Sequence, residues 1–593
     1  MNRGRRGVNG KQEKPRNVKY VLSRLWDYLS YYKWLLVICM ILTVLSNLFS
    51  LVGPKLSGLA IDAIEFGEGK VIFKDVYKYA FLMLIFYVLS SIFSYILSLL
   101  MLKMSKKIVF KLRNDAFNKI LSLPISYFDT NKTGDIISKM NYDIDTINTS
   151  LSADLIQICT SIITVVGSLI MMLTISPILV CVFVVTIPIS LMFTRFMLKK
   201  THKLFRKRSS TLGELNAYSE EMITGMKTIK AYEREEVILE KFDSYNQNAT
   251  DSAYKAEYYG SITGPGVNFV NNLSLSLICI LGAILSVISD FSLGKISSFV
   301  LYSRRFSGPI NEIANIFTDL QSAMAAAERV FGLIDAPTET IDKYNAIELK
   351  DVNGDVKLEN VTFSYDESKV ILNDVSFTAD SGKVIAIVGP TGSGKTTIVN
   401  LLMRFYDVNK GKIFVDGNEI RDLTRQSLRK SYAMVLQDTW LFEGTVYENL
   451  SYGKDDATID DVIKAAKASK IHNFITRLPN GYDTVLSEGG INISKGQKQL
   501  LTIARAMLLD SNMLILDEAT SNVDTRTEVQ IQEAMKELMK NKTCFIIAHR
   551  LSTIQNADLI LVVKDGKIIE QGNHNELLLK KGFYSNLYNA QFE

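Results

Sequence analysis

Long stretches without a charged residue restrict this chain more than any other feature of its sequence. There is no Asp, Glu, Lys or Arg inside residues 34–54, and none inside 79–102. Each stretch is long enough for one helix to cross the roughly 30 Å hydrocarbon core of a bilayer. A third stretch, 155–194, is too long for one crossing and is interrupted at 175–177 by Ile-Ser-Pro. This tripeptide predicts a tight turn between two spans, so we expect four membrane helices in these stretches.

Two further spans are expected, although the last is less apolar. The fifth lies within residues 258–289 and the sixth within 296–317. Because the sixth contains Arg304, Arg305 and Glu312, its hydropathy alone does not identify it.

Composition excludes several other classes of protein. With 593 residues, the chain is long enough for two or more domains. Its net charge of +5 is small, and no basic face interleaved with aromatic residues indicates nucleic-acid binding. The five cysteines have neither paired nor metal-ligand spacing, which favours core positions in a reducing compartment. No apolar stretch with a cleavage site directly follows the basic start, so we expect no removable signal peptide.

A change of composition divides the chain. Residues 336–350 are rich in Pro, Thr and charged residues, which predicts a linker. Residues 1–335 would then form an all-α transmembrane domain with six helices. In residues 351–593, strand-like apolar runs alternate with helical patterns, which predicts an α/β domain.

A phosphate-binding loop is predicted in this second domain. Residues 389–397 read Gly-Pro-Thr-Gly-Ser-Gly-Lys-Thr-Thr between a strand-like run and a helical pattern, the context that a P-loop requires. Backbone N–H groups would surround the phosphates at the helix start. Lys395 would reach the β- and γ-phosphates, and Thr396 would ligate Mg²⁺. The predicted ATP-binding residues of the loop are Gly389, Pro390, Thr391, Gly392, Ser393, Gly394, Lys395, Thr396 and Thr397.

A pair of acids supplies the other half of a phosphate site. An apolar run ends in Asp517 and is followed by Glu518. The first carboxylate can hold Mg²⁺, and the second is placed to polarise an attacking water. Gln437 and His549 each follow another strand-like run. Taken singly, either would more often be a structural hydrogen bonder than a site residue.

The order of these motifs resembles the nucleotide-binding domain of the ATP-binding cassette (ABC) family, and the first half resembles its six-helix exporter type. In that family the residue matching Tyr365 stacks on adenine, and the residue matching Gln437 contacts Mg²⁺. The residue matching His549 contacts the γ-phosphate, and the one matching Asp524 communicates across a dimer. The resemblance implies an ATP hydrolase coupled to transport, with ATP and Mg²⁺ as ligands.

The topology follows from where ATP is found. The nucleotide motifs must meet cytoplasmic ATP, and Lys and Arg crowd the N-terminal tail and the segments after the second and fourth spans. Six spans satisfy both conditions and place both termini in the cytoplasm. Segments 121–147 and 225–242 resemble the family's two cytoplasmic loops, whose short coupling helices press on the ATPase domains. The polar segments 104–153 and 197–257 are long enough to be helical extensions that reach them.

The family signature, usually Leu-Ser-Gly-Gly-Gln, reads Ile-Ser-Lys-Gly-Gln at residues 493–497. In the family, one subunit's signature covers the ATP held by the other, so Ser494, Lys495, Gly496 and Gln497 would contact the partner's nucleotide. Lys495 adds bulk where Gly permits close approach, whereas its charge favours phosphate. An altered signature beside intact catalytic residues resembles one subunit of heterodimeric bacterial exporters. We favour a heterodimer, and a homodimer that tolerates Lys495 remains the alternative.

The sequence names no cargo. The candidates to line a cavity lie in expected spans and are Arg304, Arg305, Asn268, Asn271 and Asn272. Ionisable groups in a membrane usually face a wet path or a partner, and amides also join helices, so structural roles remain open. The resemblance implies export of a small molecule, lipid or peptide, of the multidrug type, across a bacterial cell membrane. A membrane-anchored ATPase that senses or gates is the alternative.

Overall fold

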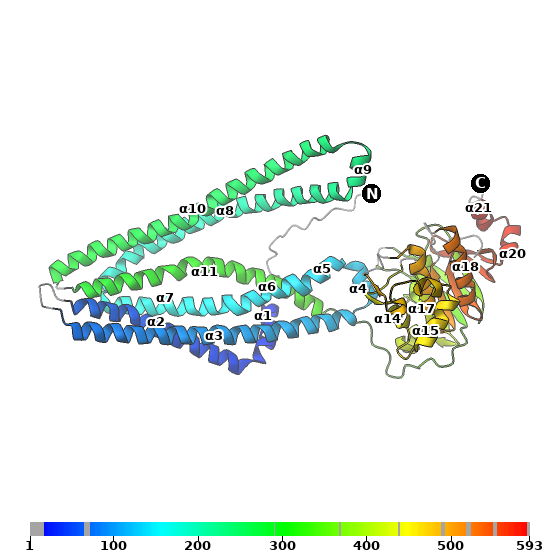
Figure 1. Ribbon diagram of the computed structural model, residues 1–593, viewed down its shortest axis with the longest axis horizontal. Helices are drawn as coiled ribbons and strands as arrows, with labels where there is room; N and C mark the ends of the chain where they lie inside the picture. The colour runs from blue at the N-terminus through cyan, green and yellow to red at the C-terminus, as the bar shows by residue number, and fades with distance from the viewer. Residues whose placement is uncertain are drawn as a thin grey trace. The chain divides into compact units, whose positions relative to one another are not determined.

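The computed structural model describes residues 17–64, 71–289, 291–366, 369–436, 439–487, 493–517, 524–548 and 554–589. The chain forms two compact units (Figure 1). The first comprises Met1–Leu123 and Asn131–Pro337, and the second comprises Pro124–Thr130 and Thr338–Glu593. The division lies at residue 337, inside the segment where composition predicts a linker.

The described residues of the first unit form helices and no strand, apart from an isolated bridge between Ile64 and Val71. Its long helices are α2 (Lys33–Asp62), α3 (Phe73–Leu121), α7 (Leu155–Ile175), α8 (Pro177–Thr224), α10 (Glu235–Ser289) and α11 (Leu293–Ile334). Shorter elements are α1 (Val18–Ser30), α5 (Thr133–Ser138), α6 (Ile144–Thr149), α9 (Met226–Ala231) and two π-helical turns, Lys139–Asp143 and Ser150–Asp154. These helices confirm the predicted all-α architecture.

Five helical stretches of the described residues are long and apolar enough to cross a membrane. They are Lys33–Asp62, Phe73–Leu121, Thr133–Ile175, Pro177–Thr224 and Glu235–Ser289. The sixth expected span coincides with α11, a 42-residue helix that does not meet the same hydropathy criterion. Arg304 and Arg305 lower its hydropathy, as the sequence indicates.

The Ile-Ser-Pro turn is confirmed between α7 and α8. Ser176 has extended backbone, and its hydroxyl accepts a hydrogen bond from the backbone N–H of Leu179. Pro177 occupies the first helical position, where its missing N–H has no intrahelical partner to lose. One residue therefore separates two long helices.

Several helices are much longer than a bilayer requires. The helices α3, α8 and α10 have 49, 48 and 55 residues, which corresponds to about 70–80 Å at 1.5 Å per residue. Figure 1 shows α8 and α10 running side by side towards the short helix α9. This confirms that the polar segments continue the apolar helices.

The second unit is built on a six-stranded sheet with the strand order β12-β11-β3-β10-β9-β6. Its strands are β3 (Val384–Val388), β6 (Tyr432–Val435), β9 (Met513–Asp517), β10 (Thr543–Ile547), β11 (Leu559–Lys564) and β12 (Lys567–Gly572). All neighbours pair in parallel except β12. A parallel sheet needs cover on both faces, and alternate residues of β9 and β10 indeed enter two separate apolar cores.

The second unit also contains two smaller sheets and ten α-helices among its described residues. An antiparallel sheet contains β1 (Val356–Phe363), β2 (Leu372–Ala379), β4 (Lys410–Val415) and β5 (Asn418–Glu419), and a two-stranded one contains β7 (Gly444–Thr445) and β8 (Val485–Leu486). The helices are α4 (Ile125–Thr130), α12 (Lys395–Leu402), α13 (Arg425–Lys430), α14 (Val446–Ser451), α15 (Ile459–Ala468), α16 (His472–Ile475), α17 (Lys495–Leu509), α18 (Thr525–Met539), α20 (His574–Leu579) and α21 (Phe583–Asn589). All five cysteines are free, and Cys544 lies in the core. The parallel sheet and its helices confirm the α/β fold that the sequence predicts for the second domain.

Candidate functional site

The loop between β3 and α12 has the shape of a phosphate cradle. Gly394 precedes α12 with a φ of 107°, and a Cβ there would lie 2.7 Å from Leu372. A Cβ on Gly389 would lie 2.1 Å from the carbonyl oxygen of Val563. Only glycine fits these two positions without displacing a neighbour.

Lys395 lies across this loop. Its Nζ donates hydrogen bonds to the carbonyl oxygens of Gly389 at 2.9 Å and Pro390 at 3.0 Å. Burial lowers the pKa of Lys395, whereas the nearby charge of Asp517 raises it. The hydroxyl of Ser393 is buried without a hydrogen-bond partner among the described residues. A buried cation, an unsatisfied hydroxyl and the free N–H groups that begin α12 together fit the phosphates of a nucleotide.

The candidate metal ligands come from neighbouring elements. Asp517 ends β9, and β10 lies between β9 and β3, so the carboxylate reaches the edge of the sheet where the loop begins. Thr396 is exposed at the second position of α12. An aspartate and a hydroxyl suit Mg²⁺, which prefers oxygen ligands. Gln437, Glu518 and His549 lie outside the described residues.

Tyr365 lies beside the start of α12. Its hydroxyl is 3.2 Å from that of Thr397 and accepts a hydrogen bond from the Asn400 amide at 3.3 Å. Its ring centroid lies 4.9 Å from that of Tyr406 in an edge-on contact. The ring is 47% exposed, so part of it remains available for stacking.

Tyr406 connects this aromatic pair to α4. Its hydroxyl donates a hydrogen bond to Asp129, in the short helix that belongs to the second unit although its sequence neighbours belong to the first. The segment where the sequence predicts a coupling helix thus contacts the ring beside Tyr365.

The signature residues begin α17. Ser494 caps the helix by accepting from the Gln497 N–H at 3.3 Å, and the Gln497 side chain accepts from the Ser494 N–H at 3.0 Å. Lys495 is exposed at the first helical position, and Gly496 is buried. Asp524 caps α18 in the same way, through the Thr527 N–H at 3.0 Å, and this bond lowers its pKa.

The signature and the phosphate loop are not joined. Among the described residues, no hydrogen bond or ion pair links 494–497 to 389–397. The two halves of the predicted ATP site therefore lie in one chain without completing each other.

In the first unit, Arg305 supplies a hydrogen-bond donor that α2 lacks. Pro54 lies inside α2 and has no N–H, so the carbonyl of Ser50 loses its usual helical donor. The Arg305 Nη1 donates to this carbonyl at 2.8 Å. Its guanidinium carbon also lies 6.0 Å from the centroid of the Tyr87 ring. Arg305 is thus engaged by its own chain.

Two more residues of α11 form hydrogen bonds with α2 close to Pro54. The Tyr302 hydroxyl donates to the carbonyl oxygen of Leu51 at 2.5 Å, and the Ser298 hydroxyl donates to that of Pro54 at 2.9 Å. Both side chains are buried.

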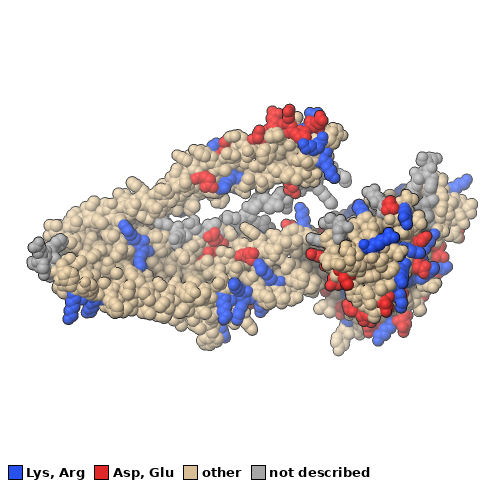
Figure 2. Space-filling view, in the orientation of Figure 1, with Lys and Arg blue, Asp and Glu red and all other residues tan. Residues whose placement is uncertain are grey.

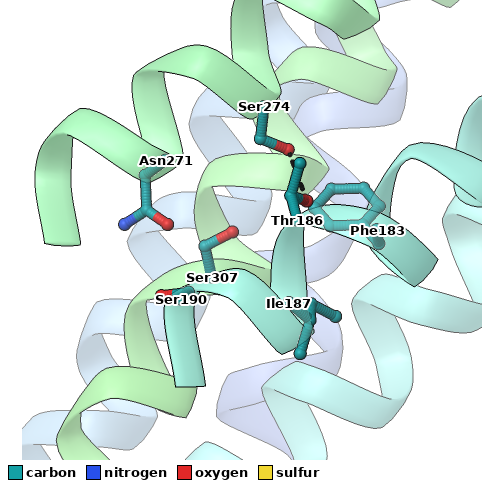
Figure 3. A pocket seen from close by; sticks show the side chains of 7 residues that line it. All are labelled: Phe183, Thr186, Ile187, Ser190, Asn271, Ser274 and Ser307. Carbon is teal, nitrogen blue, oxygen red and sulfur yellow. Dashed lines mark hydrogen bonds between the residues drawn. The ribbon is translucent and has the colours of Figure 1, made fainter. Parts of the chain in front are cut away.

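A small polar pocket lies between α8, α10 and α11 (Figure 3). Its volume is about 20 Å³. The side chains that line it are those of Phe183, Thr186, Ile187, Ser190, Asn271, Ser274 and Ser307. Thr186 and Ser274 are 3.2 Å apart and hydrogen-bonded, while Ser190 and Asn271 have no hydrogen-bond partner among the described residues. The pocket offers unused polar groups inside an apolar bundle.

Of the side chains that line this pocket, sequence reasoning singled out Asn271. Asn268 and Asn272 are exposed on α10, and Asn271 between them reaches the pocket. Thr186 and Ser190, on α8, were not singled out. Their four-residue spacing places them on one helix face and was the available signal.

Comparison with known proteins agrees with both units. Residues 36–310 match the family model for the ABC transporter transmembrane region, and residues 372–521 match that for ABC transporter. The chain is 43% identical over 583 residues to an uncharacterized ABC transporter ATP-binding protein, YfiC, of Bacillus subtilis, covering 98% of this chain and 96% of that protein. It is 43% identical over 485 residues to a fatty acid ABC transporter ATP-binding/permease protein of Mycobacterium bovis, covering 82% and 76%. The solved structure of a bacterial Atm1-family ABC exporter with ATP bound matches with a TM-score of 0.76 at 28% identity, covering 94% of this chain and 98% of that chain.

Proposed function

Because this chain belongs to the ABC transporter family, in which it is an exporter-type membrane ATPase, we propose that it is one half of a heterodimeric exporter of small molecules, lipids or peptides. Its boundaries would be a transmembrane domain over 1–335, a linker over 336–350 and a nucleotide-binding domain over 351–593. The observation that carries the proposal is the combination of a well-formed phosphate cradle with Lys495 exposed at the signature.

ATP hydrolysis coupled to transport needs a complete nucleotide site. In the proposal, Lys395 and the loop bind the phosphates, and Thr396, Gln437 and Asp517 hold Mg²⁺, which would neutralise phosphate charge. Glu518 would polarise the attacking water, and His549 would contact the γ-phosphate. These last assignments rest on the family resemblance. Tyr365 would stack on adenine, for which its half-exposed ring is suited.

The proposal includes a second chain because, in the family, ATP lies between the phosphate loop of one subunit and the signature of the other. A lysine at the first position of α17 opposes the positive end of the helix dipole, which typically costs about 0.3–1 kcal/mol. Its side chain is exposed where a partner's phosphates would approach. We propose that the partner's ATP is hydrolysed slowly under this signature, while ATP held by Lys395 is hydrolysed rapidly under the partner's regular signature. Asp524 would carry signals across the dimer.

The nature of the cargo is supported by the relatives. One of them is described as a fatty acid transporter, and the membrane stretches of this chain are apolar with few charged groups. Lipids and other amphiphiles are therefore the cargo that we favour within the broader class of small molecules and peptides.

The heterodimer is tested by symmetric substitution. The chain is purified together with a half-transporter from the same genome that has a Leu-Ser-Gly-Gly-Gln signature, and ATPase rates are measured in lipid nanodiscs. Glu518→Gln should remove most of the activity of the pair, whereas the matching change in the partner should remove little. Equal losses from both changes, or a fully active assembly of this chain with itself, would show that the dimer is symmetric.

A further inference from the structure

The two adjacent arginines of α11 lie in different surroundings. Arg305 donates to the carbonyl of Ser50. Arg304 is exposed and has no hydrogen bond or ion pair with any described residue. An unpaired cation is unfavourable in an apolar segment and normally faces a water-filled path or a partner group. Arg304 therefore needs a negative group that its own chain does not supply within the described residues.

The sequence limits how much charge this region can recognise. The apolar stretches 34–54, 79–102, 155–194 and 258–289 contain no Asp, Glu, Lys or Arg, and neither do residues 296–303. Figure 2 shows the same pattern, with charged side chains gathered near α9 and over the second unit and few along the helical bundle. Glu312 lies two turns beyond Arg304, and its side chain is outside the described set. Of the two arginines that directly follow the last of these stretches, Arg305 is bound to Ser50 and Arg304 has no partner among the described residues.

Arg304 lies on the side of α11 that borders the pocket. Ser307 lines the pocket and follows Arg304 by three residues, so the two side chains are neighbours on one helix face, about 4.5 Å apart along the axis. A Cβ on Gly308 would meet nothing within 4 Å, so this face of α11 is open. The face that carries Ser298, Tyr302 and Arg305 is instead packed on α2.

The pocket itself admits only a small polar group. A volume of about 20 Å³ suffices for one group of the size of a water molecule. Ser190 and Asn271 offer unused hydrogen-bonding groups there, while Phe183 and Ile187 contribute apolar surface. An oxygen atom of a head group fits this space, and a ring does not.

We infer that Arg304 and this pocket form a subsite for the head group of an amphiphile with a single negative charge. The inference rests on the proposed export function and specifies its cargo. A single cation matches one carboxylate, or a phosphate monoester in its singly charged form, and the neighbouring hydroxyl and amide groups can bind its oxygen atoms. The apolar bundle suits the tail. Cations would be repelled, and multiply charged solutes would lack partners.

Direct binding tests this subsite. The full-length transporter, with its partner, is placed in lipid nanodiscs, and binding of radiolabelled dodecanoate, dodecyl phosphate and neutral dodecanol is measured against empty nanodiscs. Arg304→Gln should weaken binding of dodecanoate by about tenfold or more, the range of a charge-assisted hydrogen bond. Dodecanol should bind as before, and Arg304→Lys should retain most of the affinity. The two anions distinguish a carboxylate site from a phosphate site.

The matched control is Arg195→Gln. Arg195 is an exposed arginine of α8 with no partner among the described residues, and it does not line the pocket. Removing its charge should leave dodecanoate binding unchanged. Ser190→Ala with Asn271→Ala should weaken both anions several-fold. Unchanged thermal unfolding of each variant would exclude misfolding as the cause.

Two results would overturn the subsite. One is unchanged anion binding in Arg304→Gln, and the other is an equal loss for dodecanol. ATP-dependent uptake into inverted vesicles separates the two proposals. If the anions bind through Arg304 but no amphiphile is transported, only the export function fails. If Arg304→Gln binds and transports dodecanoate like the unchanged protein, only the subsite fails.

Discussion

At the scale of single residues, Lys395 illustrates how a binding site can be unfavourable for its own fold. Its ammonium group is buried against two backbone carbonyl groups, and burial lowers its pKa. The folded state therefore disfavours the charged form, and the destabilisation is fully present below the lowered pKa. It fades as pH rises towards the ordinary value for lysine.

We therefore expect Lys395→Met to separate stability from binding. In the absence of ATP, the variant should unfold at a higher temperature than the unchanged protein at neutral pH, and the difference should shrink in alkaline buffer. Its ATPase rate should fall by about a hundredfold or more, as when a phosphate-stabilising donor is removed. Thermal unfolding with and without ATP, together with ATPase assays, would check this. A lower unfolding temperature without ATP would show that the lysine stabilises the fold.

Single residues also mark the limit of prediction from sequence. The loop around Lys395 was predictable because its glycines, its lysine and the flanking strand and helix are local in the sequence. The different surroundings of Arg304 and Arg305 were not predictable, because Arg305 is held by a carbonyl that Pro54 leaves without a donor about 250 residues earlier. No local pattern reports which residue will satisfy such a group.

At the scale of elements, α2 and α11 pack closely along a contact, here called the seam, that depends on glycines and on the interruption of α2 at Pro54. A Cβ on Gly58 would lie 2.4 Å from the carbonyl oxygen of Gly294, so the backbones of the two helices are in contact. At the same end, Asp62 accepts a hydrogen bond from the Gly294 N–H at 2.7 Å. The sequence predicted both helices but not their crossing, since close packing of two helices depends on how their faces match.

The seam makes a prediction about Arg305 and Pro54. Arg305→Gln should lower the free energy of unfolding by about 1–3 kcal/mol, because the half-buried Ser50 carbonyl loses its donor. Pro54→Ala restores a backbone N–H that can serve this carbonyl, so the same arginine change should cost less in that background. A double-mutant cycle of unfolding in detergent micelles measures the coupling, which should reach about 0.5–3 kcal/mol. Additive effects would mean that the arginine does not substitute for the missing donor.

At the scale of the whole molecule, hydrogen bonds fix the segment that connects the two units at both of its ends. In the first unit, Tyr20 and Arg24 of α1 bind Asp335 just after α11, with the Arg24 Nε at 3.1 Å. In the second unit, Arg429 Nη1 donates to Glu339 at 3.1 Å. Arg425 Nη1 also donates to Asp342, at 2.8 Å. Part of the predicted linker is therefore bound to the second unit by side-chain hydrogen bonds.

Lengthening this passage should uncouple the units. Inserting four Gly-Ser residues after Pro337 should leave ATP hydrolysis largely intact, because the nucleotide site lies within the second unit, while cargo-dependent stimulation of hydrolysis should be mostly lost. The same insertion after Asp455, in an exposed turn of the second unit, is the control. ATPase rates with and without dodecanoate measure both. Full stimulation in the lengthened variant would assign the coupling to α4 alone.

Between Asp335 and Glu339 lie Ala336, Pro337 and Thr338, whose side chains form no hydrogen bond or ion pair with a described residue. A connection of three residues, one of them a proline with a fixed φ, has few backbone torsions that can change freely. A displacement at Glu339 can therefore be absorbed by only a few backbone torsions before it reaches Asp335, directly after α11. Because Arg304 lies on the same helix, such a displacement would also act on the geometry of the proposed head-group subsite, without any change in its charges.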